Sequence, residues 1–249
     1  MVRVAVSGGA IGFAVCWHAY VYRGRSVMLR TLHAASLALL LVVQSSGRGA
    51  EQAPDQPAKP LTLTQVWTLN RTYTDPQHGV TFRYPSVWQA TTQFAYHLPA
   101  LTQSDEAKPI AGFGYSEGGF PRTRIVGPYA GTNLEGVGVV YSAVPAANAT
   151  ECEAKAATLS NSPKRPPVVF GGRSFSVYET GEGGMSQSIS GNLYATYADQ
   201  TCYLLETDLA EALPGVLNDI RALTPAQLRF IDIQLLNIMK SVRIVPTKR

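Results

Sequence analysis

The chain of 249 residues is long enough for one sizeable domain with flanking segments, and its apolar content of 45% is ordinary for a globular protein. The net charge of +4 originates in the first 50 residues, which hold five arginines and no acidic residue, whereas the remainder carries 16 basic and 17 acidic side chains. That remainder has no basic run long enough for a phosphate-binding stripe, so we do not expect a nucleic-acid partner.

The N-terminus contains two apolar segments, at residues 4–22 and 34–43. Arg30 before the second segment and small residues after it are typical of a secretory signal peptide spanning 28–50. Residues 1–27 then reflect a start codon placed too early. The alternative is an uncleaved membrane anchor in one of the apolar segments, although the second is short for a span of about 20 residues.

A cleaved leader predicts a secreted or periplasmic protein, in a compartment where disulfides persist. Cys16 is lost with the leader, which leaves Cys152 and Cys202 as an even pair. We expect them to form a structural disulfide; the alternative is two free, buried thiols. They are too far apart for a redox motif and have no nearby histidine for a zinc site, so we expect neither a metal nor a cofactor.

The mature chain begins with a proline-rich stretch, "EQAPDQPAKP", at residues 51–60. Such a composition is typical of a tether between a leader and a folded body. We expect a single domain at 61–245 and a short tail at 246–249.

Several segments alternate between apolar and polar residues, which predicts half-buried strands. In chain order these segments are 80–84, 136–144, 174–180, 188–198, 201–207 and 242–245. Asp199 and Gln200 separate two of them, so we expect an antiparallel hairpin there.

Two helices have clear start signals. Thr150 with Glu153 three residues later forms the pattern of a capping box. Thr224, followed by Pro225 and then Gln227, is a second such start. The second helix carries an apolar stripe, which we expect to pack on a sheet: Leu228, Ile231, Leu235, Ile238 and Met239. A shorter helix is expected within 208–222. The pattern predicts an α+β domain dominated by antiparallel strands.

The segment "YTDPQHGVTFRYPSVWQ" at 73–89 resembles the opening of PsbP-like domains, in which a Gly-led aromatic strand runs into Pro and then Trp. The close is also similar, with a hairpin strand "CYLLET", a helix, and "IMKSVRI" leading into the last strand. The resemblance spans most of 70–245. It implies an antiparallel β-sheet flanked by helices, in an α/β/α sandwich, and a role in binding or assembly. It carries over no binding residues, and the insertion around 100–135 departs from it.

The stretch "GFGYSEGGF" at 112–120 matches the G-x-S-x-G turn that presents a nucleophilic serine, here Ser116. In that fold the catalytic histidine follows the serine, and no histidine follows Ser116 in this chain. We therefore interpret the stretch as a glycine-rich loop. Its aromatic side chains, Phe113, Tyr115 and Phe120, are candidate contacts for a partner.

The other chemical candidates are weaker. His78 lies close to Asp75, and we interpret it as a polar turn residue before a strand; the alternative is a metal ligand or a base. A triad in another order would recruit His78 or His97 for Ser116, with Asp75 or Asp105 as the orienting group. The glycines at 112–118 and at 180–185 lack the residues of a dinucleotide loop or a P-loop.

The sequence therefore predicts an exported, non-enzymatic binding or assembly module. Its partner is an unknown protein or small ligand in the cell envelope or outside the cell, with a membrane involved only if the leader is uncleaved. The alternative is a secreted hydrolase of unusual geometry that uses Ser116 or carboxylates of the 100–135 insertion.

Overall fold

The computed structural model describes residues 59–92, 99–117, 127–160, 162–184, 186–212 and 220–245. The chain divides into two compact units, Met1–Gln52 and Ala53–Arg249, and every described residue belongs to the second. The predicted leader, most of the tether and the tail lie outside the described residues. Among the described helices, none is both long enough and apolar enough to cross a membrane.

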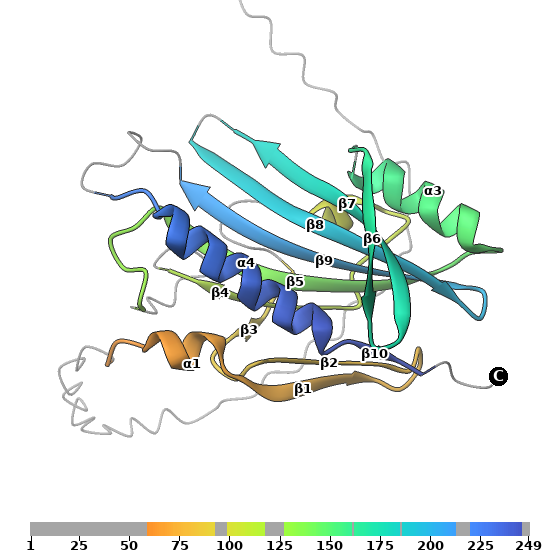
Figure 1. Cartoon of the computed structure of the whole chain (residues 1–249), viewed down its shortest axis with the longest axis horizontal. Helices are drawn as coiled ribbons and strands as arrows, with labels where there is room; N and C mark the ends of the chain where they lie inside the picture. The colour runs from red at the N-terminus through yellow and green to blue at the C-terminus, as the bar shows by residue number, and fades with distance from the viewer. Residues whose placement is uncertain are drawn as a thin grey trace, which may run out of the picture. The chain divides into compact units, whose positions relative to one another are not determined.

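Two antiparallel sheets form the domain (Figure 1). The large sheet has seven strands in the order β3-β4-β5-β9-β8-β7-β6, and the small sheet has the order β1-β2-β10. The strands of the large sheet are β3 Gln89–Ala90, β4 Ala111–Ser116, β5 Leu134–Pro145, β6 Lys164–Phe170, β7 Arg173–Gly183, β8 Gln187–Ala198 and β9 Thr201–Ala212. Those of the small sheet are β1 Leu69–Asp75, β2 Val80–Pro85 and β10 Arg243–Ile244.

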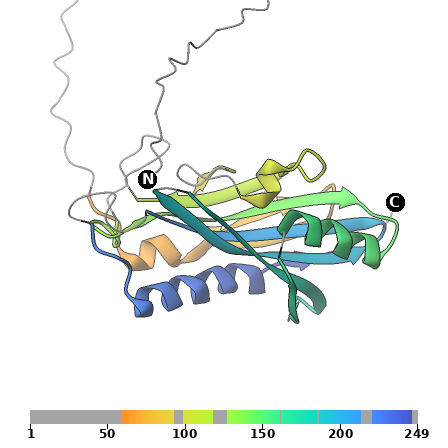
Figure 2. The ribbon, with the colours of Figure 1, turned by 90° about the horizontal axis from the view of Figure 1, so that it is seen from above.

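The helices are α1 Leu63–Trp67, α2 Ala100–Gln103, α3 Ala149–Ser160 and α4 Pro225–Lys240. Figure 2 shows α4, in dark blue, on one side of the large sheet and α2, in yellow, on the other. The larger core lies between the large sheet, α4 and the small sheet. The smaller core lies on the opposite face, beneath α2 and α3. The predicted α+β fold, an antiparallel sheet flanked by helices, is confirmed.

Because both faces of the large sheet are covered, its strands are more buried than the alternation predicted. The alternation places Tyr194 and Thr196 on the same face of β8 as the polar residues Ser190 and Asn192, yet they are only 6% and 7% exposed. Tyr194 belongs to the larger core, while its neighbour Leu193 belongs to the smaller one. The alternation of the sequence correctly assigns residues to the two faces of the strand. It does not show that a second layer of the protein also covers the more polar face.

The predicted hairpin between 188–198 and 201–207 is confirmed as β8–β9. Its two-residue turn, Asp199 and Gln200, has φ values of 47° and 60°, and Ala198 pairs with Thr201 directly across it. Positive φ at both central residues is the turn geometry that matches the twist of paired strands. The hairpin therefore has a defined register along its whole length.

Helix α4 begins as predicted. The Thr224 hydroxyl accepts a hydrogen bond from the backbone N–H of Gln227, and the side-chain oxygen of Gln227 accepts one from the backbone N–H of Thr224. Pro225 occupies the first turn. The predicted apolar stripe of α4 packs against the larger core. Its buried residues are Ile231, Leu235, Ile238 and Met239.

Two helix predictions are wrong in detail. Helix α3 is capped by Asn148, not Thr150: Asn148 Oδ1 accepts from Glu151 N at 2.9 Å. Asparagine caps a helix as well as threonine does, so the pattern alone did not choose between them. The expected helix within 208–222 is not present at 208–212, because these residues continue β9 and pair with β8.

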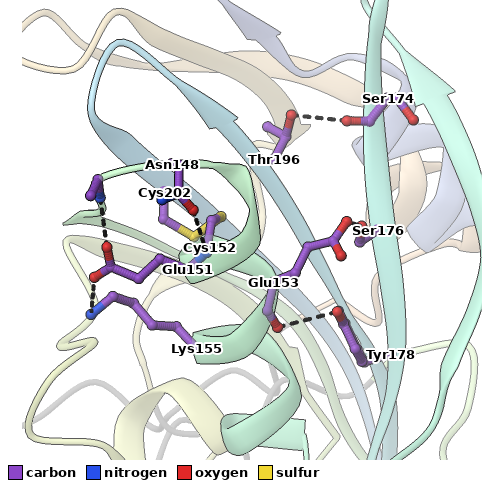
Figure 3. The surroundings of a disulfide bond; sticks show 11 residues. Asn148, Glu151, Cys152, Glu153, Lys155, Ser174, Ser176, Tyr178, Thr196 and Cys202 are labelled. Carbon is purple, nitrogen blue, oxygen red and sulfur yellow. Dashed lines mark hydrogen bonds and ion pairs between the residues drawn. A yellow bond between two sulfur atoms is a disulfide. The ribbon is translucent and has the colours of Figure 1, made fainter.

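The predicted disulfide between Cys152 and Cys202 is confirmed, and it joins α3 to the start of β9 (Figure 3). Glu153 on the same helix accepts a hydrogen bond from Ser176 Oγ of β7 at 2.7 Å, and its backbone carbonyl accepts one from the Tyr178 hydroxyl at 3.2 Å. A covalent bond and two hydrogen bonds thus hold α3 against the large sheet.

Candidate functional site

Ser116 is the last residue of β4, where its hydroxyl donates to the backbone carbonyl of Glu135 at 2.9 Å. His78 is engaged elsewhere, with Asp75, and His97 lies outside the described residues. The serine is therefore held by the neighbouring strand and has no base among the described residues that contact it.

The predicted contact loop needs a correction. Phe113 and Tyr115 lie in strand β4, with 8% and 2% of their surfaces exposed, because they face the larger core. Phe113 stacks on Tyr84 of β2 at a ring-centroid distance of 4.0 Å. Neither side chain offers a surface to a partner, and Phe120 lies outside the described residues.

A carboxylate of the 100–135 insertion has a structural role. Glu117 Oε1 accepts hydrogen bonds from the Tyr115 hydroxyl at 2.6 Å and from Tyr129 N at 2.8 Å, and Oε2 accepts one from Gly127 N at 3.2 Å. Trp67 Nε1 in turn donates to the Tyr129 hydroxyl at 2.9 Å. Burial and this carboxylate both raise the pKa of Tyr115 far above its usual value. Glu117 thus ties residues 127–129 to the end of β4.

Asp75 and His78 meet in the turn between β1 and β2, with 2.7 Å between Asp75 Oδ2 and His78 Nδ1. Asp75 also accepts from the Tyr141 hydroxyl at 3.3 Å, and the Tyr203 hydroxyl donates to the His78 carbonyl at 3.2 Å. Burial acts to raise the pKa of Asp75, but the hydrogen bonds and charge of His78 lower it overall. The pair anchors the small sheet's hairpin on strands β5 and β9 of the large sheet.

A pair of acidic residues, which the sequence did not reveal, lies in the middle of the large sheet. Glu206 and Asp208 stand two residues apart on β9, so both point to the face that carries Cys202. Their exposures are 0% and 1%. Glu206 is held by two backbone amides of α2: Ala100 N donates to Oε1 and Leu101 N to Oε2, each at 2.9 Å.

Asp208 lies in a row of three residues across the sheet. Thr180 of β7 pairs with Gly191 of β8, which pairs with Asp208 of β9. A Cβ at Gly191 would meet Asp208 Oδ1 at 2.6 Å and Thr180 Oγ1 at 2.8 Å, so only glycine lets the two polar side chains close over it. The side chain of Thr180 interacts with both Glu206 and Asp208, and the two carboxyls interact with each other, so these buried groups form one polar cluster.

These groups line a cavity of about 180 Å³ between α2, the end of α3 and the large sheet. Its described lining is Pro99, Ala100, Gln103, Leu159, Ser160, Thr180, Gly181, Glu182, Ile189, Glu206 and Asp208. Gln103 and Glu182 are exposed, and Gln103 Nε2 donates to Glu182 Oε2 at 3.1 Å. This bond joins α2 to β7 at the solvent side of the cavity, so we define the whole feature as the acidic cavity.

The two buried carboxyls influence each other's protonation. Burial raises the pKa of Glu206, while the Leu101 and Ala100 amides favour its ionised form. Burial and the adjacent Glu206 charge raise the pKa of Asp208 well above its usual range. Of the two carboxyls, Asp208 therefore holds its proton more strongly. Strongly perturbed carboxyls in a cavity are a physical indication of a functional site.

The signal in the sequence was the run "LETD", residues 205–208, in which two acids alternate within an otherwise apolar strand. Period two places them on one face, but placing Asp208 in a helix concealed it. Among the described residues, no group of three His, Cys, Asp or Glu side chains could hold a metal ion.

A larger groove of about 520 Å³ lies on the opposite face of the sheet, beside α4. It is lined by parts of β6, β7, β8 and β9 and by Asp232 and Leu235 of α4, and the main chain of Gly191 contributes to it. An ion pair between Arg165 and Glu179 lies at this groove. Burial raises the pKa of Asp232.

No protein-family model matches the chain, and no curated protein matches it. Among solved structures, it is similar to the Ran-binding protein Mog1p of Saccharomyces cerevisiae, with 9% identity, 72% of this chain and 97% of that chain covered, and a TM-score of 0.40. It is also similar to LpqN, described as involved in cell envelope biogenesis of Mycobacterium tuberculosis, at 9% identity, coverage of 71% and 90%, and a TM-score of 0.37.

A third similar structure comes from Bacteroides thetaiotaomicron, at 8% identity and a TM-score of 0.37. The match covers 72% of this chain and 49% of that one, so the chain spans about half the length of that protein. At these scores the similarities carry no functional argument.

Proposed function

We propose that the protein is an exported, non-enzymatic binding module that holds a small ligand in the acidic cavity. The observation that carries this proposal is a cavity of about 180 Å³ whose lining joins apolar side chains to two buried carboxyls with raised pKa values, Glu206 and Asp208.

The size of the cavity supports a small ligand. An apolar protein cavity of about 150 Å³ takes a molecule the size of benzene, so about 180 Å³ suits a ligand of roughly six to ten non-hydrogen atoms. The lining combines polar groups with the side chains of Leu159, Ile189 and Pro99. Such a combination of apolar walls and a few convergent polar groups is usual for a ligand site.

Binding is better supported than catalysis. Glu206 already accepts one backbone amide on each carboxylate oxygen, which suits a structural anchor for α2 more than a group that exchanges protons with a substrate. The alternative hydrolase also lacks support at the residues first considered for it. Ser116 is bonded to the backbone of β5, Glu117 holds a turn, and Asp105 forms an exposed ion pair with Lys108.

Export rests on two supports. The disulfide is of a kind that persists in oxidising compartments, and the sequence at 28–50 is typical of a leader. The PsbP-like resemblance, which implies a binding or assembly role, is a further support for the proposal and remains a prediction.

The test is a panel of small cationic, neutral and anionic compounds, screened by thermal shift and by chemical-shift perturbation on the mature protein. The variant Gln103→Trp places a bulky ring at the exposed edge of the cavity. Lys108→Trp, at an exposed position of the same insertion outside the cavity lining, is the matched control. We expect binding to wild type and to the control but not to Gln103→Trp. Binding that is equal in all three proteins, or no binding at all, would contradict the proposal.

A further inference from the structure

We infer that the groove beside α4 is a second binding site, and that its ligand is a short neutral oligosaccharide. The groove lies on the opposite face of the large sheet from the acidic cavity, and the described linings of the two share no residue. The inference therefore goes beyond the function proposed above and does not depend on it. A volume of about 520 Å³ falls within the range of about 300–1,000 Å³ that is usual for ligand clefts.

The hydrogen-bonding side chains of the groove are arranged by strand register. Glu179 of β7, Asn192 of β8 and Thr207 of β9 are paired in one row across the sheet. Ser190 stands two residues from Asn192 on β8, which places it on the same face at a distance of about 7 Å. Asp232 of α4 lines the helix side of the groove. Polar groups therefore line the groove both along one strand and across three.

The surface that a ligand would meet in this groove is mainly polar. Its apolar residues are largely closed off, and four of them are only 5–6% exposed: Val177, Tyr194, Leu209 and Leu235. The charged, hydroxyl and amide residues of the lining are exposed or half-buried: Arg165, Glu179, Ser190, Asn192 and Asp232. An alkyl chain laid over these groups would remove their water without replacing its hydrogen bonds, which is costly. The groove thus selects against a lipid tail.

The exposed groups offer both donors and acceptors. The Arg165 guanidinium donates, and the carboxylates of Glu179 and Asp232 accept. The Asn192 amide and the Ser190 hydroxyl do both. Within the described part of the chain, the side chains of Ser190, Asn192 and Asp232 have no hydrogen-bond or ion-pair partner. Each hydroxyl of a sugar both donates and accepts, so a sugar is able to satisfy all of these groups, whereas a ligand that only donates or only accepts is not.

The charge of the groove favours a neutral ligand. Arg165 and Glu179 form an ion pair, which leaves Asp232 as the one charged lining residue without an ion-pair partner among the described residues. An anion would lie against this carboxylate. A small cation would pair with Asp232 and leave the amide and hydroxyl groups of β8 without a partner.

A peptide ligand is less well supported than a sugar. Extended peptides commonly bind by adding a strand to the edge of a sheet. The groove lies on the face of the sheet, where β7, β8 and β9 each pair with a strand on both sides. The nearby edge strand, β6, carries Pro166 and Pro167, which have no N–H to donate to an added strand.

The size of the groove and its accessible apolar residues fit a disaccharide. A cavity of about 150 Å³ takes a molecule of benzene, so about 520 Å³ suits a ligand of roughly 20 non-hydrogen atoms. A disaccharide is of this size. Pro166, Val168 and Leu236 are at least partly exposed in the lining. They suit the C–H faces of sugar rings, which are much less polar than the edges that carry the hydroxyls.

The test is calorimetry on the full mature protein with a panel of neutral disaccharides: maltose, cellobiose, lactose and diacetylchitobiose. Hexanoate, n-butylammonium and trialanine serve as the lipid-like, cationic and peptide comparisons. We expect at least one disaccharide to bind at least tenfold more tightly than all three comparisons. For that sugar, chemical-shift changes are expected at the backbone amides of Ser190 and Asn192.

Asn192→Leu and Asp232→Leu each remove a hydrogen-bonding group of the groove, and we expect each to weaken sugar binding at least tenfold. Asn237→Leu is the matched control, since it introduces the same side chain on α4 outside the described lining, and it is expected to leave the affinity unchanged. Asp232 is exposed on α4, so Asp232→Leu still provides the test if Asn192→Leu does not fold.

The outcomes also separate this inference from the proposed function. Sugar binding that Gln103→Trp abolishes and Asn192→Leu leaves intact would place the sugar in the acidic cavity, which overturns the inference and supports the proposed function. No binding of any disaccharide, or tighter binding of a comparison compound, overturns the inference and leaves the proposed function to its own panel. Sugar affinity that is unchanged in folded Asn192→Leu and Asp232→Leu overturns it as well.

Discussion

Removal of the Cys152–Cys202 bridge is the most direct test of what holds this domain together. The bridge joins residues separated by 50 positions, and the chain-entropy model assigns such a loop roughly 4 kcal/mol of stabilisation at 25 °C. Both sulfurs are buried, with exposures of 1% and 0% for the two residues. For a domain of this size, 1 kcal/mol corresponds to about 2–4 °C in melting temperature, so we expect a loss of roughly 8–16 °C.

The assay compares wild type, the double variant C152A/C202A and reduced wild type, each followed by urea and thermal unfolding. Alanine avoids burying a hydroxyl at either site. The slope of unfolding free energy against urea should also increase in the double variant, because the uncrosslinked unfolded chain exposes more surface. If the melting temperature fell by less than 2 °C while a thiol assay confirmed complete reduction, the reasoning would be refuted. The most direct reading would then be that the unfolded chain is already compact.

Four further changes test other features. For Asp208→Asn, we expect a free energy of unfolding equal to that of wild type near pH 4 and higher than that of wild type at pH 8. Because the pKa of Asp208 is raised in the folded state, its protonated form contributes fully to wild-type stability below the unfolded pKa of about 3.9, and this contribution is lost as pH rises through the folded pKa. A difference in urea midpoint that does not vary with pH would contradict this expectation. Asp75→Asn, with a lowered folded pKa, should cost about 1–3 kcal/mol at pH 7, and the cost should shrink as pH falls below about 3.9; a constant cost in acid would refute the assignment. Gly191→Ala should cost about 1–3 kcal/mol from the close contacts of its new methyl, while its control Gly183→Ala, with open space around it, should stay within about 0.5 kcal/mol; equal melting temperatures for the two would show that the sheet relaxes. Thr224→Ala should cost about 1 kcal/mol through loss of the α4 cap, measured by urea unfolding, and an unchanged midpoint would mean that the cap contributes nothing.

Local signals in the sequence predicted those parts of the fold that depend on neighbouring residues. The β8–β9 hairpin and the start of α4 are set by short-range geometry, at Asp199–Gln200 and at Thr224–Gln227, and both are confirmed. The disulfide could be predicted because assigning Cys16 to the predicted leader left two cysteines, which allow only one pairing. In each case few competing arrangements exist.

Long-range contacts account for what was missed. Strand β9 continues through Asp208 because it pairs on both sides, with β5 and β8, and no local pattern reports such pairing. The burial of Phe113 and Tyr115 depends on the small sheet and α4 covering the large sheet. The acidic cavity is assembled from α2, α3, β7 and β9, and α2 and β9 are more than 100 residues apart in the sequence. The sequence could therefore place the two carboxyls on one face of a strand, but it could not show that they line a cavity.

The single glycine at position 191 has a consequence for both faces of the sheet. On one face its missing side chain lets Thr180 and Asp208 approach each other, and on the other its main chain lines the groove beside α4. At this point the main chain of β8 and the side chains of Thr180 and Asp208 separate the groove from the acidic cavity. The sheet is therefore a partition between two hollows as well as a scaffold, and a side chain at residue 191 would displace the polar groups that complete it.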